Sequence, residues 1–389
     1  MSEIEPRVGL HALLIVALLT ALLPSGAAAL PAPAPARPRV LAYYVPYDPT
    51  SWASLAANPD AIDALGVQWV TIDACGNLGS RDDQTLNQFA RAHGIGLFPS
   101  LLTGSRGLNH ALLADDDTAA HAIDQIVAYT IAEGYDGFDL DLEGIAPEDR
   151  AAYSAFVAAV AAALHQQGKT LALALPAKSR DVTTGWAGAY DYAALGGSAD
   201  LVTIMTYDDH GSWGEPGPVA PFDWVEAVIA FATSQIPADK VLIGLASYGY
   251  DWNVTSGGAR SLSYSQAAAL ADRYQVPIVL DPATQSATFG YQAPAGDPAP
   301  TRAQPPPLQH QITERLAPPC PVPGPPPAPP PAPTPSPPAG ELQDHVVWLE
   351  ESASAAARLG LVDRYHTGGV ADWRLGLEDP RLWSVLRRQ

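Results

Sequence analysis

The sequence predicts an α/β protein folded as a closed (β/α)8 barrel, a TIM barrel, and three observations support this prediction. From residue 39 onward, short apolar runs alternate with longer helical patterns, which is typical of βα units around a parallel sheet. About eight such runs occur over a length that suits a barrel. Polar and aromatic residues gather where several runs end. An open, doubly wound sheet is the alternative, but no glycine-rich phosphate-binding turn follows an early strand.

The expected strands and helices follow one another in regular order. The strands cover residues 40–45, 67–73, 95–101, 134–144, 170–175, 201–205, 241–245 and 370–373. The helices between them cover residues 82–93, 115–133, 147–167 and 222–235. Two helices carry end signals, because acids at 115–117 favour a helix N-terminus and Pro147 and Gly168 suit a helix start and end.

The regular order breaks between the seventh and eighth strands. A helix expected at 263–274 and short strands expected at 277–280, 288–291 and 346–349 predict a small α+β insertion over residues 247–366. Within it, residues 293–339 are dominated by proline and alanine, a composition expected to be extended or disordered. The residues after this tract are too few for a second domain and supply the last strand. The tract is therefore expected to be an excursion within one domain, residues 39–389.

The first 29 residues resemble a signal peptide. An apolar run at 10–23 precedes the small residues 27–29, which suit a cleavage site, and it is shorter than the ~20 residues that span a bilayer. Acidic residues outweigh basic ones at its start, so a retained membrane anchor is the alternative. Residues 30–38 are expected to be a Pro/Ala linker. The mature protein is expected to be secreted or extracytoplasmic.

The composition limits the possible partners. A formal net charge of −20 argues against nucleic acid and against an anionic membrane surface. The two cysteines, Cys75 and Cys320, rule out a disulfide framework and offer no metal-binding cluster, and whether they pair with each other is left open. No cofactor and no metal are expected, and the protein is expected to be a monomer.

Acidic residues alternate with apolar ones in the fourth expected strand. The period of two places Asp139, Asp141 and Glu143 on one face and apolar residues on the other. Like charges about 6.6 Å apart, two residues at ~3.3 Å each, repel one another. If the face is enclosed, at least one carboxyl keeps its proton near neutrality, as a general acid must. A solvated surface strand is the alternative.

Three expected strand ends carry functional groups. In a barrel, the carboxyl ends of the strands face the active site because the βα loops gather there. The fourth strand ends at Glu143, the sixth is followed by Tyr207 and Asp208, and the eighth ends at Trp373. Acids, a tyrosine hydroxyl and a tryptophan around one cavity predict a sugar site, because an aromatic face packs on the C–H groups of a pyranose.

These motifs resemble those of glycoside hydrolase family 18, the chitinase-like family. Asp136-Gly137-Phe138-Asp139-Leu140-Asp141-Leu142-Glu143 is similar to its DGxDxDxE signature. Met205-Thr206-Tyr207-Asp208 is similar to its sixth-strand motif, Trp373 to its eighth-strand tryptophan, and residues 43–47 to its opening. The branch of spore-cortex and cell-wall lytic enzymes is the most similar, through residues 207–210, 247–252 and 368–373.

The resemblance implies a role for each catalytic residue. Glu143 matches the general acid that protonates the glycosidic oxygen and later activates water. Asp141 matches the carboxylate that orients the substrate's N-acetyl group, and Asp139 matches its buried partner. Tyr207 matches the hydroxyl that contacts the acetamido group. The substrate's carbonyl oxygen then replaces an enzyme nucleophile.

Four further residues are expected on the substrate side. Asp208 is a supporting contact, and Trp373 is the floor beneath the sugar. Tyr44, from the opening strand, and Asp136, the first acid of the signature, complete the set, with Asp136 chiefly structural. Three other tryptophans are equally compatible with outer sugar subsites and with packing: Trp52, Trp213 and Trp252.

The resemblance implies a secreted glycosidase. It would hydrolyse β-1,4 linkages at N-acetylglucosamine in a cell-wall glycan, peptidoglycan or a related polymer, by a retaining, substrate-assisted mechanism. Many chitinases continue after the acid with Tyr-Pro, whereas Gly144 follows Glu143 here, which weakens chitin as the substrate. The alternatives are a chitinase and a catalytically inert, lectin-like protein on the same fold.

Overall fold

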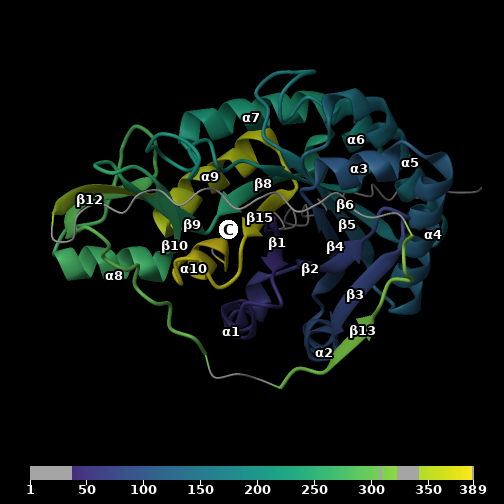
Figure 1. The fold of residues 1–389 in the computed structure, drawn as a ribbon, viewed down its shortest axis with the longest axis horizontal. Coiled ribbons are helices and arrows are strands. Elements are labelled where there is room, and N and C mark those ends of the chain that lie inside the picture. Colours follow the sequence, from purple (N-terminus) through teal and green to yellow (C-terminus); the bar gives the residue numbers. More distant parts are fainter. Residues whose placement is uncertain (1–36, 306–308, 322–340, 388–389) are drawn as a thin grey trace, which may run out of the picture. The chain divides into compact units, whose positions relative to one another are not determined.

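The computed structural model describes residues 37–305, 309–321 and 341–387, and these contain a closed barrel (Figure 1). Eight parallel strands follow one another around the ring, and β1 pairs with both β2 and β15, which closes it. The barrel prediction is confirmed and the open sheet is excluded. The barrel strands are β1 (Arg39–Tyr44), β2 (Ala64–Ile72), β4 (Gly96–Thr103), β5 (Gly137–Leu142), β6 (Thr170–Pro176), β7 (Leu201–Met205), β8 (Val241–Ala246) and β15 (Gly369–Trp373).

Helices cover the outside of the barrel. Aspartates begin two of them, because the side chain of Asp83 accepts from backbone N–H groups at the start of α2 and that of Asp115 accepts at the start of α4. The helices are α1 (Pro49–Ala57), α2 (Gln84–His93), α3 (Arg106–Leu113), α4 (Asp116–Ala132), α5 (Arg150–Gln166), α6 (Tyr192–Ser198), α7 (Phe222–Gln235), α9 (Ser352–Tyr365) and α10 (Leu382–Arg387). Short 3-10 turns are η1 (Pro59–Ala61), η2 (Pro147–Asp149) and η3 (Ala238–Lys240).

The strands divide their side chains between two cores. In β1, Val40, Ala42 and Tyr44 belong to the large core between strands and helices. Leu41 and Tyr43 point the other way and join the smaller core inside the barrel. This alternation is the period of two of a β-strand, and it decides which residues can reach a site at the barrel mouth.

Two antiparallel strands extend the barrel sheet beyond β2. β3 (Leu78–Asp83) pairs with β2, and β13 (Ile312–Arg315) pairs with β3. The helix expected at 82–93 therefore starts too early, because Asp82 and Asp83 end β3. Figure 1 shows β13 beside β3, at a distance from the insertion that contains α8 and β12.

The insertion between β8 and α9 forms its own sheet. Its five strands are antiparallel in the order β10-β9-β14-β12-β11, and α8 packs on them. The expected end of the insertion at 366 is too late, because α9 packs against α7, β8 and β15 as a barrel helix. The elements of the insertion are β9 (Tyr248–Asn253), β10 (Ala259–Ser263), α8 (Tyr264–Tyr274), β11 (Val279–Leu280), β12 (Ala287–Pro294) and β14 (Leu342–Leu349).

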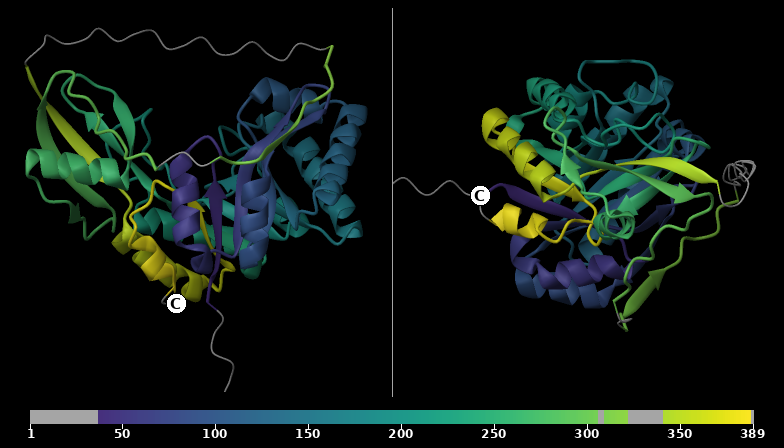
Figure 2. Two further views of the ribbon diagram at one scale, coloured as in Figure 1. Left: turned by 90° about the horizontal axis from the view of Figure 1, so that it is seen from below. Right: turned by 90° about the vertical axis from the view of Figure 1, so that its left-hand side faces the viewer.

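The described parts of the Pro-rich tract are ordered against the rest of the chain. Its first residues end β12, and residues 309–321 lie along β3, as Figure 2 shows. Cys320, in this segment, forms a disulfide with Cys75, which answers the question that the sequence left open. The expectation for the tract is extended or disordered chain, and its described parts are extended chain in defined positions, while 306–308 and 322–340 lie outside the described residues.

The N-terminal predictions lie almost entirely outside the described residues. The expected signal peptide, 1–29, and most of the expected linker, 30–38, precede the first described residue, Arg37. Within the described ranges, none of the helices combines the length and the apolar character needed to cross a membrane.

Candidate active site

The acidic face of β5 points into the mouth of the barrel. Asp139 is completely buried, Asp141 is 4% exposed, and Glu143 lies just past the end of the strand. The apolar residues between them point outward into the core between strand and helices. The alternation predicted from the sequence is therefore present, and the acid face is enclosed.

Burial raises the pKa values of the two inner acids. The hydroxyl of Ser100 donates to one oxygen of Asp139 at 2.6 Å, and burial raises the pKa of Asp139 to about 6. Burial, followed by the charges of Glu143 and Asp139, raises the pKa of Asp141 well above its usual value, although Gln68 donates to it at 3.5 Å. One oxygen on each aspartate lacks a hydrogen-bond partner among the described residues. Both carboxyls can therefore hold or accept a proton.

The backbone around Glu143 is fixed from two sides. Its N–H donates to the carbonyl of Thr103 at 2.7 Å, and the buried amide of Asn109 donates to its carbonyl at 2.6 Å. Gly144 follows with a φ of 69°, and a Cβ there would lie 3.5 Å from the ring of Trp186. Burial, and then the charge of Asp208, raise the pKa of Glu143, as a general acid requires.

The opposite wall comes from the ends of β7 and β15. Tyr207 lines the same cavity as Asp141 and Glu143, and burial, followed by the charges of these two acids, raises the pKa of Tyr207. Asp208 accepts from the hydroxyls of Tyr248 at 2.7 Å and Tyr250 at 3.0 Å. Both tyrosines belong to the insertion, so the insertion supports this wall.

Trp373 completes the wall at the end of β15. Its ring packs edge-on against that of Tyr43, with the ring centroids 5.4 Å apart. Tyr43 itself belongs to the core inside the barrel. The interior core thus holds the indole in place at the barrel mouth.

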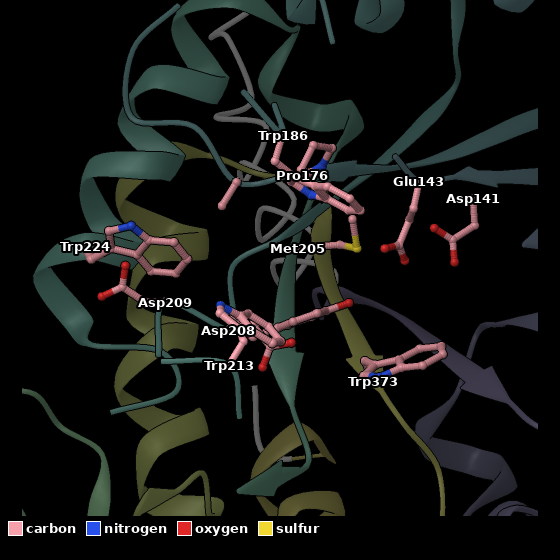
Figure 3. Close-up of a pocket in the computed structure, with 12 residues that line it drawn as sticks. Asp141, Glu143, Pro176, Trp186, Met205, Asp208, Asp209, Trp213, Trp224 and Trp373 are labelled. Carbon is pink, nitrogen blue, oxygen red and sulfur yellow. The ribbon is translucent and has the colours of Figure 1, made fainter. Parts of the chain in front are cut away.

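A cavity of about 710 Å³ joins these walls. Figure 3 shows the carboxylates of Asp141 and Glu143 side by side at one end of it, with Trp373 across the cavity and Trp224 at the far end. It is lined by Asp141, Glu143, Pro176, Ala177, Trp186, Met205, Tyr207, Asp208, Asp209, Trp213, Trp224 and Trp373. Carboxylates at several points and indole surface along its length suit a chain of sugars.

Most of the residues predicted from the sequence meet at this cavity. Five of them line it: Glu143, Asp141, Tyr207, Asp208 and Trp373. The remaining predicted catalytic residue, Asp139, is buried on the same face of β5 as Asp141, and its charge contributes to the raised pKa of Asp141. The acids of one strand and the side chains of two distant strands are thus brought together.

Two predicted substrate residues are not brought to the cavity. Tyr44 is 2% exposed and belongs to the outer core, because the strand alternation points Tyr43 inward in its place. Asp136 precedes β5, at the opposite end of the strand from Glu143, and its carboxylate accepts from the N–H of Leu97 at 2.8 Å. The structural role expected for Asp136 agrees with this contact, whereas a substrate contact does not.

The tryptophans separate into two groups. Trp213, 73% exposed, lines the cavity, whereas Trp52 packs on Phe89 and Trp252 is buried in the insertion. Sequence reasoning missed Trp186 and Trp224, which also line the cavity. Both lie in or beside loops that follow barrel strands, and that position was the available signal.

The acids of the cavity do not form a metal site. Among the described residues, the group of His, Cys, Asp or Glu side chains close enough to share an ion is Asp73, Cys75 and Cys320. Both sulfur atoms of this group form the disulfide.

The curated relatives include a glycosylase and a cortical fragment-lytic enzyme. An uncharacterized glycosylase of Bacillus subtilis is 30% identical over 267 residues, which cover 68% of this chain and 64% of that protein. The cortical fragment-lytic enzyme of the same organism is 29% identical over 287 residues, 72% of this chain and 56% of that one. The chain thus spans little more than half to about two thirds of these relatives' length.

Solved structures and a family model agree with these similarities. A chitinase from Chromobacterium violaceum has a TM-score of 0.73 at 27% identity, covering 90% of this chain and 98% of that one. The spore cortex-lytic enzyme of Bacillus megaterium shares the fold, with a TM-score of 0.72 at 24% identity over 91% of this chain and 75% of that one. The family model described as glycosyl hydrolases family 18 matches residues 39–378. The similarity predicted from the motifs is thereby confirmed, and the chain belongs to glycosyl hydrolases family 18.

Proposed function

We propose that this protein hydrolyses β-1,4 linkages at N-acetylglucosamine residues of a cell-wall glycan, with retention of configuration and with help from the substrate. The observation that carries the proposal is the enclosed row of acids on β5, which shares the cavity with Tyr207 and lies across it from Trp373. Such a row provides one proton donor and one carboxylate next to it. No second carboxylate is needed as a nucleophile, because the acetamido oxygen of the sugar acts as the nucleophile.

In the first step, Glu143 acts as the general acid. Its carboxyl proton passes to the glycosidic oxygen, the bond from that oxygen to the anomeric carbon breaks, and the leaving sugar departs as an alcohol. The acetamido oxygen of the retained sugar bonds to the anomeric carbon from the opposite face, which gives a cyclic oxazolinium ion. The raised pKa of Glu143 favours the protonated form that this step requires.

Asp141 holds the acetamido group during this step. As a carboxylate it accepts the acetamido N–H and stabilises the positive charge that develops there, while the hydroxyl of Tyr207 donates to the carbonyl oxygen and orients it. Asp139, buried behind Asp141, takes up or shares the proton that would otherwise neutralise its partner. Coupled acids of this kind titrate as a unit.

In the second step, Glu143 acts as the general base. Its carboxylate removes a proton from water, the water oxygen bonds to the anomeric carbon, and the ring of the oxazolinium ion opens to restore the acetamido group. Two displacements on opposite faces return the original configuration at that carbon. The indole of Trp373 supports the reacting sugar, and Trp186, Trp213 and Trp224 offer apolar surface to the rest of the chain.

Peptidoglycan or a related wall polymer is the proposed substrate. The support is the similarity to proteins named for cortex lysis and the glycine that follows Glu143. A chitinase is the alternative, supported by the 27% identical solved structure. Extracytoplasmic action is also proposed, and the Cys75–Cys320 disulfide supports it, because disulfides persist in oxidising compartments.

The substrate is tested by digestion of purified peptidoglycan and of chitin oligomers, followed by mass spectrometry of the products. Peptidoglycan fragments that carry a new reducing N-acetylglucosamine end are expected. Products from chitin alone would reverse the assignment to peptidoglycan. A protein that binds oligosaccharides but releases no product from either polymer would instead be a lectin.

A further inference from the structure

The segment of residues 309–321, named here the strap, is held firmly along β3. Its residues Ile312–Arg315 pair with Asp83–Ser80 in an antiparallel ladder, and the imidazole of His310 contacts the carboxylate of Asp83. Near its end, the amide of Asn77 donates to the carbonyl of Pro318 at 3.4 Å, and Cys320 is bonded to Cys75. A strap fixed at both ends can serve as the wall of a binding site.

The strap approaches the barrel closely because β3 carries a glycine. A Cβ at Gly79 would lie 2.9 Å from the hydroxyl of Thr71 and 3.3 Å from the carbonyl of Arg315 in the strap. A larger residue would therefore push the strap away from β3. The close approach leaves a defined space on the other side of the ladder.

That space is a groove of about 520 Å³ between the strap, the β2–β3 ladder and the end of β1. Exposed apolar side chains form part of its rim, since Tyr47 and Leu316 are each 79% exposed. Arginine, glutamate, serine and glutamine side chains supply polar groups between them. The lining residues are Pro46, Tyr47, Gln68, Trp69, Val70, Thr71, Gly79, Ser80, Arg81, Ile312, Glu314, Arg315, Leu316 and Ala317.

Gln68 connects the groove to the catalytic cavity. It lines the groove, and its amide donates to Asp141, which lines the cavity, at 3.5 Å. In Figure 3 the carboxylates of Asp141 and Glu143 lie at the end of the cavity away from Trp224. Because Gln68 lines the groove and donates to Asp141, the groove adjoins the end of the cavity that holds Asp141 and Glu143.

We propose that this groove binds the continuation of the glycan strand, so that the strap extends the substrate site and favours long chains cut at internal bonds. The inference rests on the proposed function, because continuity with the catalytic cavity is what identifies the occupant. Sugar rings match the lining, since their C–H faces pack on apolar side chains and their hydroxyls bond to polar ones. The strap thus contributes to length selectivity and takes no part in the chemical step.

The shape of the groove depends on the disulfide between Cys75 and Cys320. Cys75 lies on the turn between β2 and β3, and its bond to Cys320 holds the strap end against that turn. Loss of this bond frees the strap end and widens the groove. Binding of long chains then weakens, while the cavity at β5, β7 and β15 keeps its own contacts.

The inference is tested with kcat and KM for a chitobiose-based chromogenic substrate and for a long oligosaccharide of N-acetylglucosamine. The variants are Tyr47→Ala, Leu316→Ala and the double variant Cys75→Ser/Cys320→Ser. Leu342→Ala is the matched control, because Leu342 is an exposed leucine of the insertion outside the groove. About a five- to tenfold loss of kcat/KM is expected on the long substrate, chiefly through KM, with the short substrate and the control unchanged.

The outcomes separate this inference from the proposed function. Equal losses on both substrates, or no loss on the long one, would overturn the role of the groove while hydrolysis continued. If the wild-type protein hydrolyses neither of these substrates and releases no fragments from purified peptidoglycan, the proposed function fails. Calorimetric binding of the long oligosaccharide then still tests the groove: weaker binding by Leu316→Ala than by Leu342→Ala supports it, and equal binding overturns it.

Discussion

The catalytic cavity and the strap groove are built in different ways. The cavity takes Asp141, Glu143, Tyr207 and Trp373 from the ends of regular barrel strands, and their positions follow from the closed sheet. The groove takes one wall from an irregular, Pro-rich segment that depends on a short ladder and a disulfide. The residues proposed for catalysis thus lie on the barrel strands, whereas the proposed selectivity for long substrates depends on the strap, which is attached to the barrel.

This difference predicts that the two regions can be damaged separately. Changes on β5 abolish turnover and leave the fold and the groove intact. Changes at the attachment points of the strap reduce stability and long-chain binding and leave turnover of short substrates intact. The following predictions test this separation, from the largest expected effect to the smallest.

Glu143→Gln is expected to reduce kcat by roughly 10²- to 10⁴-fold, because the amide has the shape of the acid but cannot donate its proton. Oligosaccharide binding is retained. Release of reducing ends measures the first effect, and calorimetry measures the second. Glu148→Gln is the control, because Glu148 is exposed five positions along the chain. Hydrolysis by Glu143→Gln at the wild-type rate would refute the assigned mechanism.

Cys75→Ser/Cys320→Ser is expected to lower the free energy of unfolding by about 2–4 kcal/mol, because the cross-link constrains the unfolded chain. Denaturant unfolding, with and without reductant, measures this change. The reduced wild-type protein should match the double variant, which controls for the substituted side chains. Unchanged stability would show that the ladder with β3 holds the strap without the disulfide.

Asp208→Asn is expected to move the alkaline limb of the kcat profile to lower pH. In the proposed mechanism, activity requires protonated Glu143 and is lost as the pH rises through its pKa, and the charge of Asp208 helps to raise that pKa. Without the charge, the pKa falls and activity is lost at a lower pH. Asparagine suits the backbone there, because it tolerates the positive φ of 62° at this position.

A pH profile of kcat measured with a short substrate detects this shift. A short substrate is used because it does not reach the groove. The acid limb should change less, because the neighbouring Asp141 and Asp139 are left in place. A limb that stays at the wild-type pH would show that the charge of Asp208 does not reach Glu143.

The sequence predicted the cavity better than the groove for physical reasons. Alternation over β5 marks which acids share a face, so Asp139, Asp141 and Glu143 could be assigned from local pattern alone. The same rule cannot choose between Tyr43 and Tyr44, because both are large and amphipathic and one position of register decides which points inward. In the structure, Tyr43 is the one that points into the core inside the barrel.

The strap had no comparable local signal. β13 is short and completely exposed, and it pairs with a strand more than 200 positions earlier in the chain. Its proline-rich surroundings favour extended or disordered chain in any local interpretation. The disulfide likewise joins residues 245 positions apart, and their proximity depends on the whole fold. Trp186, in the loop after β6, and Trp224, in the first turn of α7, were missed because neither belongs to a strand motif, and only their position after a barrel strand pointed to the cavity.

The central claim, hydrolysis assisted by the substrate's own acetamido group from the Glu143 and Asp141 side of the cavity, is tested most directly by the configuration of the first product. Proton NMR during early digestion of a soluble N-acetylglucosamine oligomer resolves the α and β anomers of the new reducing end before they interconvert. Two displacements at the anomeric carbon predict the β anomer first. Initial release of the α anomer would contradict the account.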